Sequence, residues 1–138
     1  MVWIKLPYLC RPEGPPAGFR CDFPIISIQI IRDKKVFETV GLIDSGCQRT
    51  HINHDIADFL GIDPHEGTKT NTSGITGMSE GFSTSIQMKV KDGGDVFGAP
   101  VVFVKGLPVA VLLGQENFFE KFNVRFEKSK GFFYIERV

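Results

Sequence analysis

The sequence lacks an excess of charge of either sign. Sixteen Lys and Arg residues are balanced by sixteen Asp and Glu residues, so the formal net charge at pH 7 is zero. Proteins that bind the phosphate backbone of nucleic acids use a basic excess, because neutralising phosphates supplies much of their affinity. We therefore expect no nucleic-acid partner.

Long apolar runs are also absent. The longest, residues 99–104 and 108–113, are about a third of the ~20 residues that a membrane-spanning helix needs. At the N-terminus, residues 2–7 are too few for the apolar core of a secretory signal, and Pro7 interrupts them. The sequence therefore predicts no membrane partner.

Cysteine is scarce. The three residues, Cys10, Cys21 and Cys47, are an odd number at irregular spacing, without a Cys-x-x-Cys pair. This pattern is not typical of a disulfide framework. It predicts reduced thiols and a cytoplasmic localisation.

The chain has 138 residues, of which 42% are hydrophobic, which is typical of one globular domain. Residues 7–18 are rich in Pro and Gly and show no helical or strand period, so they predict a loop or extended arm. We divide the chain into an N-terminal Pro/Gly-rich arm, residues 1–22, and a folded domain, residues 23–138.

Short strands dominate the predicted secondary structure. Ile26, Ile28 and Ile30 recur at every second position, which is typical of a half-buried strand. A second strand ends at Ile43 in an apolar stretch that predicts burial on both faces. The other expected elements are strands over residues 82–90, 96–104 and 109–113, a helical turn over 116–121, and a final hairpin of 123–127 and 132–136.

One segment has the pattern of a complete helix. Asn53 is a good N-cap, and Gly61 supplies the left-handed residue that ends a helix. Between them Ile56, Phe59 and Leu60 predict one apolar face. Many strands and few helical turns predict a mostly β chain that forms a closed sheet or barrel.

A hairpin is expected over residues 68–90, because a Gly-, Thr- and Ser-rich segment precedes an alternating one. Its tip is Gly74-Ile75-Thr76-Gly77. The tip is not a phosphate loop, since no Gly-Lys-Ser/Thr follows it.

The most informative motif is Asp44-Ser45-Gly46, directly after the second strand. An acid that follows a buried strand must be hydrogen-bonded or have a functional reason to be there. Gly46 allows a sharp turn that brings backbone N–H groups to the carboxylate, and the Ser45 hydroxyl can fix its plane. Taken alone, the tripeptide is also compatible with an ordinary turn that caps a strand.

The surrounding residues add specificity. Residues 40–52, followed by the predicted helix, resemble the active-site segment of retropepsin-like aspartic proteases. Val111-Leu112-Leu113-Gly114 resembles the second landmark of that family, an apolar pair and Gly before a short helix. The hairpin over residues 68–90 lies where the family carries its flap. Together the three landmarks cover residues 36–126.

Aspartic proteolysis needs two carboxylates that share a proton. This chain has one Asp-Ser/Thr-Gly and is too short for a two-lobed enzyme. The dyad must therefore combine Asp44 of two subunits around a two-fold axis. The resemblance implies the same assembly: a single-lobe acid-protease barrel with one or two short helices, acting as a homodimer that joins partly through its terminal strands. The segment over residues 132–135 is a plausible contributor.

The resemblance also implies roles for individual residues. Asp44 would act as the catalytic acid and base of a peptide hydrolase, with Ser45 and Gly46 orienting the dyad. No cofactor or metal is implied. The residues expected to contact a peptide substrate are Gln48, Gly74, Ile75, Thr76, Gly77, Met78, Val109 and Val111.

Three alternatives stay open at this point. The fold can serve as a non-catalytic peptide-binding or assembly module. His51 and His54 near Cys47 could hold a metal, although they lack the i, i+4 spacing and general-base Glu of a zinc protease helix. Cys47 with His51 could form a cysteine nucleophile, although the family places a small buried residue at that position.

Overall fold

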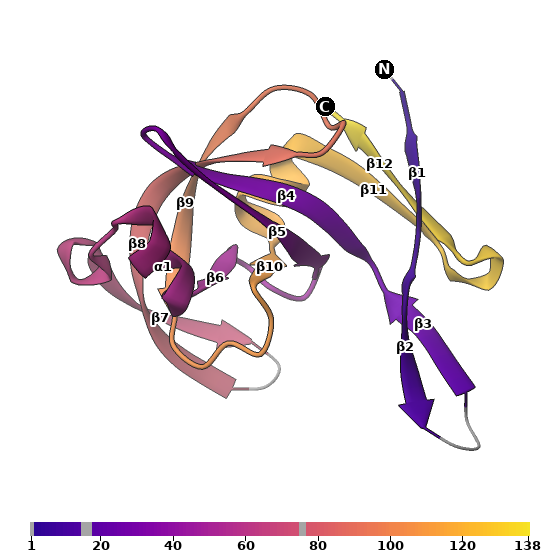
Figure 1. The fold of residues 1–138 in the computed structure, drawn as a ribbon, viewed down its shortest axis with the longest axis horizontal. Helices are drawn as coiled ribbons and strands as arrows, with labels where there is room; N and C mark the ends of the chain where they lie inside the picture. The colour runs from indigo at the N-terminus through magenta and orange to yellow at the C-terminus, as the bar shows by residue number, and fades with distance from the viewer. Residues whose placement is uncertain (1, 15–17, 75–76) are drawn as a thin grey trace.

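The computed structural model describes residues 2–14, 18–74 and 77–138. Its main body is a seven-stranded sheet in the order β4-β5-β10-β6-β9-β8-β7, which an additional β4–β8 pairing closes into a barrel (Figure 1). This confirms the prediction of a mostly β closed barrel. The strands are β4 (Ile25–Arg32), β5 (Lys35–Ile43), β6 (His51–Asn53), β7 (Thr68–Gly74), β8 (Gly77–Val90), β9 (Phe97–Val104) and β10 (Val111–Leu113).

Period-two alternation directs side chains into the barrel. In β4, Ile26, Ile28 and Ile30 are buried, as expected, and they join the main core. The end of β5 differs from the expectation, because Val40 is 47% exposed. Its strand faces the core on one side only, so the apolar stretch did not mean burial on both faces.

A second sheet contains the chain termini, with β1 (Ile4–Pro7), β12 (Phe132–Arg137) and β11 (Phe122–Glu127) in that order, all antiparallel. We call it the terminal sheet. The 3₁₀ turn η3 (Lys128–Lys130) connects β11 to β12, which confirms the predicted final hairpin. Phe133 and Ile135 of β12 are 0% exposed, so half of the segment expected at a subunit interface belongs to the core of the chain itself.

The segment predicted as a loop or extended arm is built largely of strands. β2 (Leu9–Gly14) and β3 (Gly18–Phe23) form an antiparallel hairpin that extends from the body (Figure 1). Its base is fixed to the terminal sheet, since the Tyr8 N–H donates to the Gly131 carbonyl at 3.3 Å and Lys128 pairs with Asp22 at 3.1 Å. Because this hairpin forms a two-stranded sheet of its own, its apolar and polar residues need not alternate along each strand. This explains why residues 7–18 showed no strand period.

The expectation of three reduced thiols is wrong for two of them. Cys10 and Cys21 form a disulfide between β2 and β3, while Cys47 is free and buried. The expectation failed because the pairing depends on a hairpin that the sequence pattern did not reveal. The predicted cytoplasmic localisation loses its support, since it was inferred from reduced cysteines.

Helix α1 (His54–Leu60) has the predicted caps. The Asn53 side chain accepts a hydrogen bond from the Asp55 N–H at 3.0 Å, and Gly61 ends the helix at φ +68°. Its buried residues are Ile56, Ala57 and Leu60. Phe59 was expected on this face but is 55% exposed, and it packs edge-on against Phe37 of β5 instead.

Two more helical turns complete the described chain, η1 (Pro64–Glu66) and η2 (Gln115–Phe119). The second replaces the turn expected over residues 116–121, and it is irregular because Asn117 has φ +79°. None of the helices in the described residues is long and apolar enough to cross a membrane.

Candidate functional site

The site is built where β5 ends. Strand β10 lies beside β5 in parallel and beside β6 in antiparallel orientation, so it separates two strands that are consecutive in the chain. The residues between β5 and β6, 44–50, therefore pass over the end of β10; we call them the aspartate loop. Its first residue is fixed at once, because the Asp44 N–H donates to the Leu113 carbonyl at 3.0 Å.

Asp44 lies at the start of a tight turn and, as a residue, is half-buried. The Gly46 N–H donates to its Oδ1 at 3.0 Å, and the Cys47 N–H donates to the Asp44 carbonyl at 3.2 Å. Within the described residues, the other carboxylate oxygen has no hydrogen-bond partner. The next two residues, Ser45 and Gly46, are exposed, so the turn lies at the surface of the chain.

Residues that follow β10 hold the aspartate loop through hydrogen bonds, and we call this set of contacts the clasp. The backbone N–H groups of Gln115 and Glu116 donate to the carbonyls of Cys47 and Gln48, each at 2.8 Å. The Gln115 side chain donates to the Ser45 carbonyl at 2.8 Å. The two segments are about 70 residues apart in the chain, and this contact makes them one structural unit.

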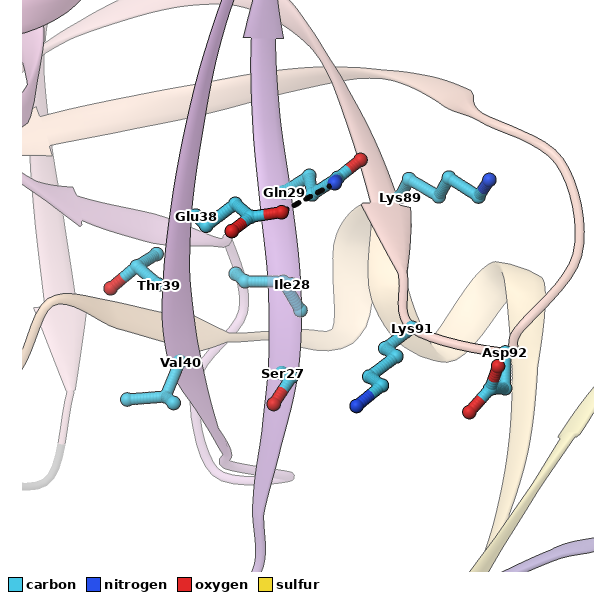
Figure 2. Close-up of a pocket in the computed structure, with 9 residues that line it drawn as sticks. All are labelled: Ser27, Ile28, Gln29, Glu38, Thr39, Val40, Lys89, Lys91 and Asp92. Carbon is cyan, nitrogen blue, oxygen red and sulfur yellow. Dashed lines mark hydrogen bonds between the residues drawn. The ribbon is translucent and has the colours of Figure 1, made fainter.

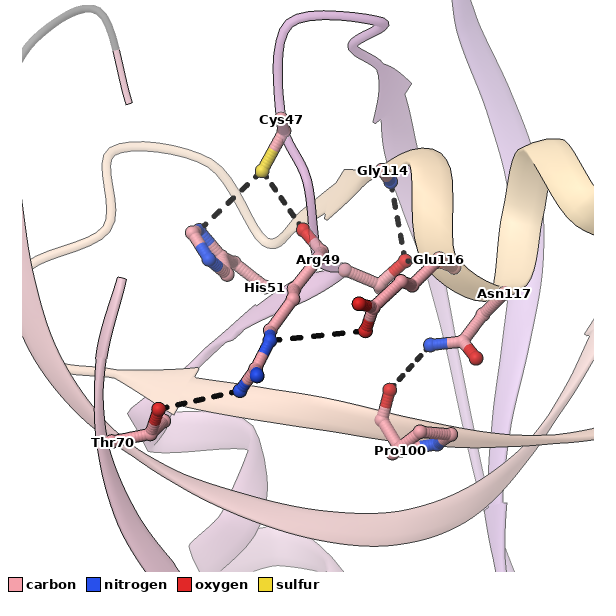
Figure 3. Close-up of polar contacts among 9 residues, drawn as sticks. Cys47, Arg49, His51, Thr70, Pro100, Gly114, Glu116 and Asn117 are labelled. Carbon is pink, nitrogen blue, oxygen red and sulfur yellow. Dashed lines mark hydrogen bonds and ion pairs between the residues drawn. The ribbon is translucent and has the colours of Figure 1, made fainter. Parts of the chain in front are cut away.

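Thr50 supports the clasp from beneath. Its side chain is 0% exposed; its Oγ1 accepts from the Gly114 N–H at 3.2 Å and donates to the Glu116 carbonyl at 3.3 Å. Nearby, the buried Asn117 side chain hydrogen-bonds the Pro100 carbonyl of β9 (Figure 3). Sequence reasoning gave no role to Gln115 or Thr50; a hydroxyl residue six positions after the acid was the only signal.

The side chain of Cys47, in the aspartate loop, points toward His51 at the start of β6 (Figure 3). The Cys47 thiol donates to the Arg49 carbonyl at 2.8 Å, and its Sγ is 3.8 Å from His51 Nδ1. Burial raises the pKa of the Cys47 thiol, and the negative charge of Asp44 raises it further. A buried thiol held in its protonated form is a poor nucleophile, which argues against a cysteine mechanism.

His51 is held mainly in its neutral form. Burial lowers the pKa of His51 below the ordinary 6.5, and the positive charge of Arg49 lowers it as well. The negative charge of Asp44 acts in the opposite direction and raises the pKa. As the pH falls below about 6.5, the unfolded chain takes up a proton that native His51 resists. The stabilisation due to neutral His51 is therefore complete above that pH, and it is lost as the pH falls through the pKa of the folded chain.

This shift leads to a prediction. Replacing His51 by Val, a good strand former, should make the free energy of unfolding less dependent on pH below about 6.5. Urea titrations of both chains at several pH values between about 7.5 and 5 would measure the difference. Identical slopes of stability against pH would contradict the assigned role of burial.

The expected substrate-contacting residues separate into three groups. The hairpin is confirmed, with Gly74 paired to Gly77 at the ends of β7 and β8, but its tip residues Ile75 and Thr76 lie outside the described residues. Met78 is in β8. The third group comes from loops and β10 and comprises the exposed Gln48, the half-buried Val109 and the fully buried Val111.

Burial corrects one of these expectations. Val111 is 0% exposed and its side chain joins the core, so it cannot contact a substrate without leaving the core. The alternation of β10 directs the neighbouring Leu112, which is half-buried, to the other side. Residues 109–113 are all apolar, so the sequence did not show which of them faces inward.

A surface hollow of about 590 Å³ lies elsewhere, over the outer sides of β4, β5 and β8 (Figure 2). Gln29 of β4 donates to its cross-strand neighbour Glu38 of β5 at 3.0 Å, and Lys89 and Lys91 also line the hollow. It contains no residue of the aspartate loop. Its side chains are mostly exposed and polar, so we assign no chemistry to it. Within the described residues, no group of three or more His, Cys, Asp or Glu side chains could hold a metal ion.

The fold is similar to a known structure, a retropepsin-like aspartic protease from Rickettsia conorii. The TM-score is 0.62, the sequence identity is 15%, and the match covers 97% of this chain and 90% of that chain. No family model and no curated protein matches the sequence. The likeness confirms the expected fold, a retropepsin-like single-lobe barrel.

Proposed function

We propose that the chain is an aspartic endopeptidase that acts as a homodimer. The observation that carries the proposal is the conformation of Asp44. One carboxylate oxygen is fixed by the Gly46 N–H, and the other has no hydrogen-bond partner among the residues that the structure describes. The clasp by residues 113–116 keeps this carboxylate at one place and orientation. The likeness of the fold to an aspartic protease adds support.

In the proposed reaction, a water molecule binds between Asp44 and its symmetry mate. As the water oxygen attacks the scissile carbonyl carbon, the ionised carboxylate takes a proton from the water and the protonated carboxyl gives its proton to the carbonyl oxygen. The product is a tetrahedral diol. It collapses to the two peptides as the first carboxyl passes its proton to the leaving nitrogen and the second takes one back from a diol hydroxyl. Two carboxylates ~3 Å apart cannot both ionise readily, so the pair shares one proton over a range of pH.

The second carboxylate must come from a second copy of the chain, because the chain has a single Asp-Ser/Thr-Gly. The terminal sheet is the surface we propose for this association, since its outer strands β1 and β11 can pair with strands of another subunit. Removing residues 131–138 would not test this idea, because Phe133 and Ile135 are core residues and their loss should unfold the subunit.

We propose an unfolded peptide or protein segment as the substrate. The β7–β8 hairpin would close over it, with the segment from Gly74 to Met78 supplying backbone hydrogen bonds and excluding water. Gln48 and Val109 would contact its side chains. We keep Ser45 and Gly46 in the role of orienting the dyad.

The proposal is tested by cleavage of a mixed peptide library with and without a statine-type inhibitor. Activity should depend on pH as a bell, because the doubly protonated and doubly ionised pairs are both inactive. The inhibitor should abolish it, and a chelator should not. Activity that stays flat between about pH 4 and about pH 9 would argue against a carboxylate dyad. Peptide binding without cleavage would favour a binding module.

A further inference from the structure

Arg49 connects three separate elements. Its Nη1 donates to Thr70 Oγ1 in β7 at 3.3 Å, and its Nε is 3.8 Å from Glu116 Oε2 in η2 (Figure 3). Its backbone belongs to the aspartate loop. The side chains of Arg49 and Glu116 are 39% and 40% exposed, so the pair lies at the surface beside the candidate site.

Two of the three elements form a rigid base. Both neighbours of Arg49 in the chain are bonded to Glu116. The Glu116 N–H donates to the Gln48 carbonyl at 2.8 Å, and the Thr50 hydroxyl donates to the Glu116 carbonyl. Arg49 and Glu116 are thus fixed to the same backbone framework before their side chains meet. The guanidinium is a planar group with donors in several directions, so it can keep Glu116 and still reach a third element.

The third element is held less firmly. Strand β7 is the last in the order of the seven-stranded sheet, and among the described residues it pairs with β8 alone. Lys69 and Glu80 form an ion pair at 3.2 Å, but both belong to the hairpin and do not connect it to the rest. The hydrogen bond from Arg49 to the Thr70 side chain joins β7 to the aspartate loop.

We propose that Arg49 is a positioning residue that fixes the base of the β7–β8 hairpin to the aspartate loop. The Glu116 carboxylate orients the guanidinium of Arg49, and the Thr70 hydroxyl accepts a hydrogen bond from it. This tie, the contact of Arg49 with Thr70 and Glu116, is a property of the folded chain. Its consequence for catalysis is that the hairpin is held at the correct distance from the substrate, and this consequence rests on the proposed function. Loss of the tie should weaken substrate binding more than the chemical step, because Arg49 does not touch the reacting atoms.

Thr70→Val and Thr70→Ser are the test variants. Valine has nearly the same shape and is a better strand former, so the hairpin itself should not weaken, whereas serine keeps the hydroxyl. Amide hydrogen exchange over residues 68–72 of the full chain should become about fivefold faster in the valine variant. This factor corresponds to the net contribution of one hydrogen bond to local stability. The serine variant should exchange like the wild type, and Arg49→Gln should exchange like the valine variant.

The control is Glu38→Gln, which removes an exposed carboxylate on β5, beside the hollow to which no chemistry is assigned and away from the tie. It should leave KM unchanged, while Thr70→Val and Arg49→Gln raise KM several-fold with little change in kcat. Unchanged hydrogen exchange in Thr70→Val would overturn the proposal. If exchange responds as expected but no peptide is cleaved, the tie is upheld and the proposed protease function fails.

Discussion

The Asp44→Asn chain is expected to fold and to associate like the wild-type chain and to have lost peptide cleavage. Asparagine has nearly the same shape, and its side-chain oxygen can still accept the hydrogen bond from the Gly46 N–H. It can neither take a proton from water nor share one with a second carboxyl. The rate should fall by about 10²–10⁴-fold, the usual contribution of a positioned acid–base group.

A mixing experiment tests the two-fold dyad itself. If each active site takes Asp44 from two subunits, a dimer with one mutant chain is as inactive as one with two. Random exchange in an equal mixture leaves a quarter of the dimers wild type, which is half of the active dimers that were present before mixing. Excess mutant chain should therefore inhibit the wild type, and the inhibition should appear at the rate of subunit exchange.

Sedimentation or native mass spectrometry of differently tagged chains would show whether exchange has occurred. Mixed dimers that keep full wild-type activity would contradict the shared dyad. A cysteine nucleophile or a single-chain site would also give no inhibition in this experiment. The Cys47→Ala chain distinguishes a cysteine nucleophile from an aspartic mechanism. It should remain active if Asp44 catalyses the reaction and lose activity if Cys47 is the nucleophile.

The sequence allowed good predictions where a structure is determined locally. The alternation of Ile26, Ile28 and Ile30 corresponds to the buried face of β4, and Asn53 and Gly61 begin and end α1 as expected. These signals are strong because backbone periodicity and capping involve neighbouring residues. Where every residue was apolar, as in residues 109–113, the same reasoning could not choose the inward face, and Val111 was misplaced.

Contacts between distant segments could not be predicted in this way. The Asp44 turn was expected from its tripeptide, but its fixation by Gln115 and Thr50 depends on β10 lying between β5 and β6. The disulfide between Cys10 and Cys21 likewise depends on a hairpin whose sequence shows no alternation of apolar and polar residues. Such contacts are determined by the topology, which no single segment encodes.

Gly114→Ala is expected to damage both the fold and the site. A Cβ at Gly114 would lie 2.5 Å from the Arg49 carbonyl oxygen and 2.7 Å from the Cys47 carbonyl oxygen. Both are backbone atoms of the aspartate loop, so they cannot yield as a flexible side chain can. Gly114 itself has φ −104°, which alanine adopts without strain, and the whole effect is therefore steric.

The loop must move away from β10 to make room for this methyl group. Overpacking of this kind costs about 1–3 kcal/mol, so Tm should fall by roughly 3–12 °C. The backbone hydrogen bonds from Gln115 and Glu116 to the loop should lengthen, and Asp44 should lose the position that the proposed dyad requires. Below the lowered Tm, the folded variant should therefore be nearly inactive, with its association intact.

Gly98→Ala is the matched control, because a Cβ at Gly98 in β9 would meet no heavy atom within 4 Å. That variant should melt within about a degree or two of the wild type and keep its activity, since alanine in open space changes mainly the unfolded chain. Differential scanning calorimetry and peptide cleavage on the same three chains would give both quantities. If Gly114→Ala retained wild-type Tm and full activity, the close packing of Gly114 against the aspartate loop could not be what fixes the Asp44 carboxylate.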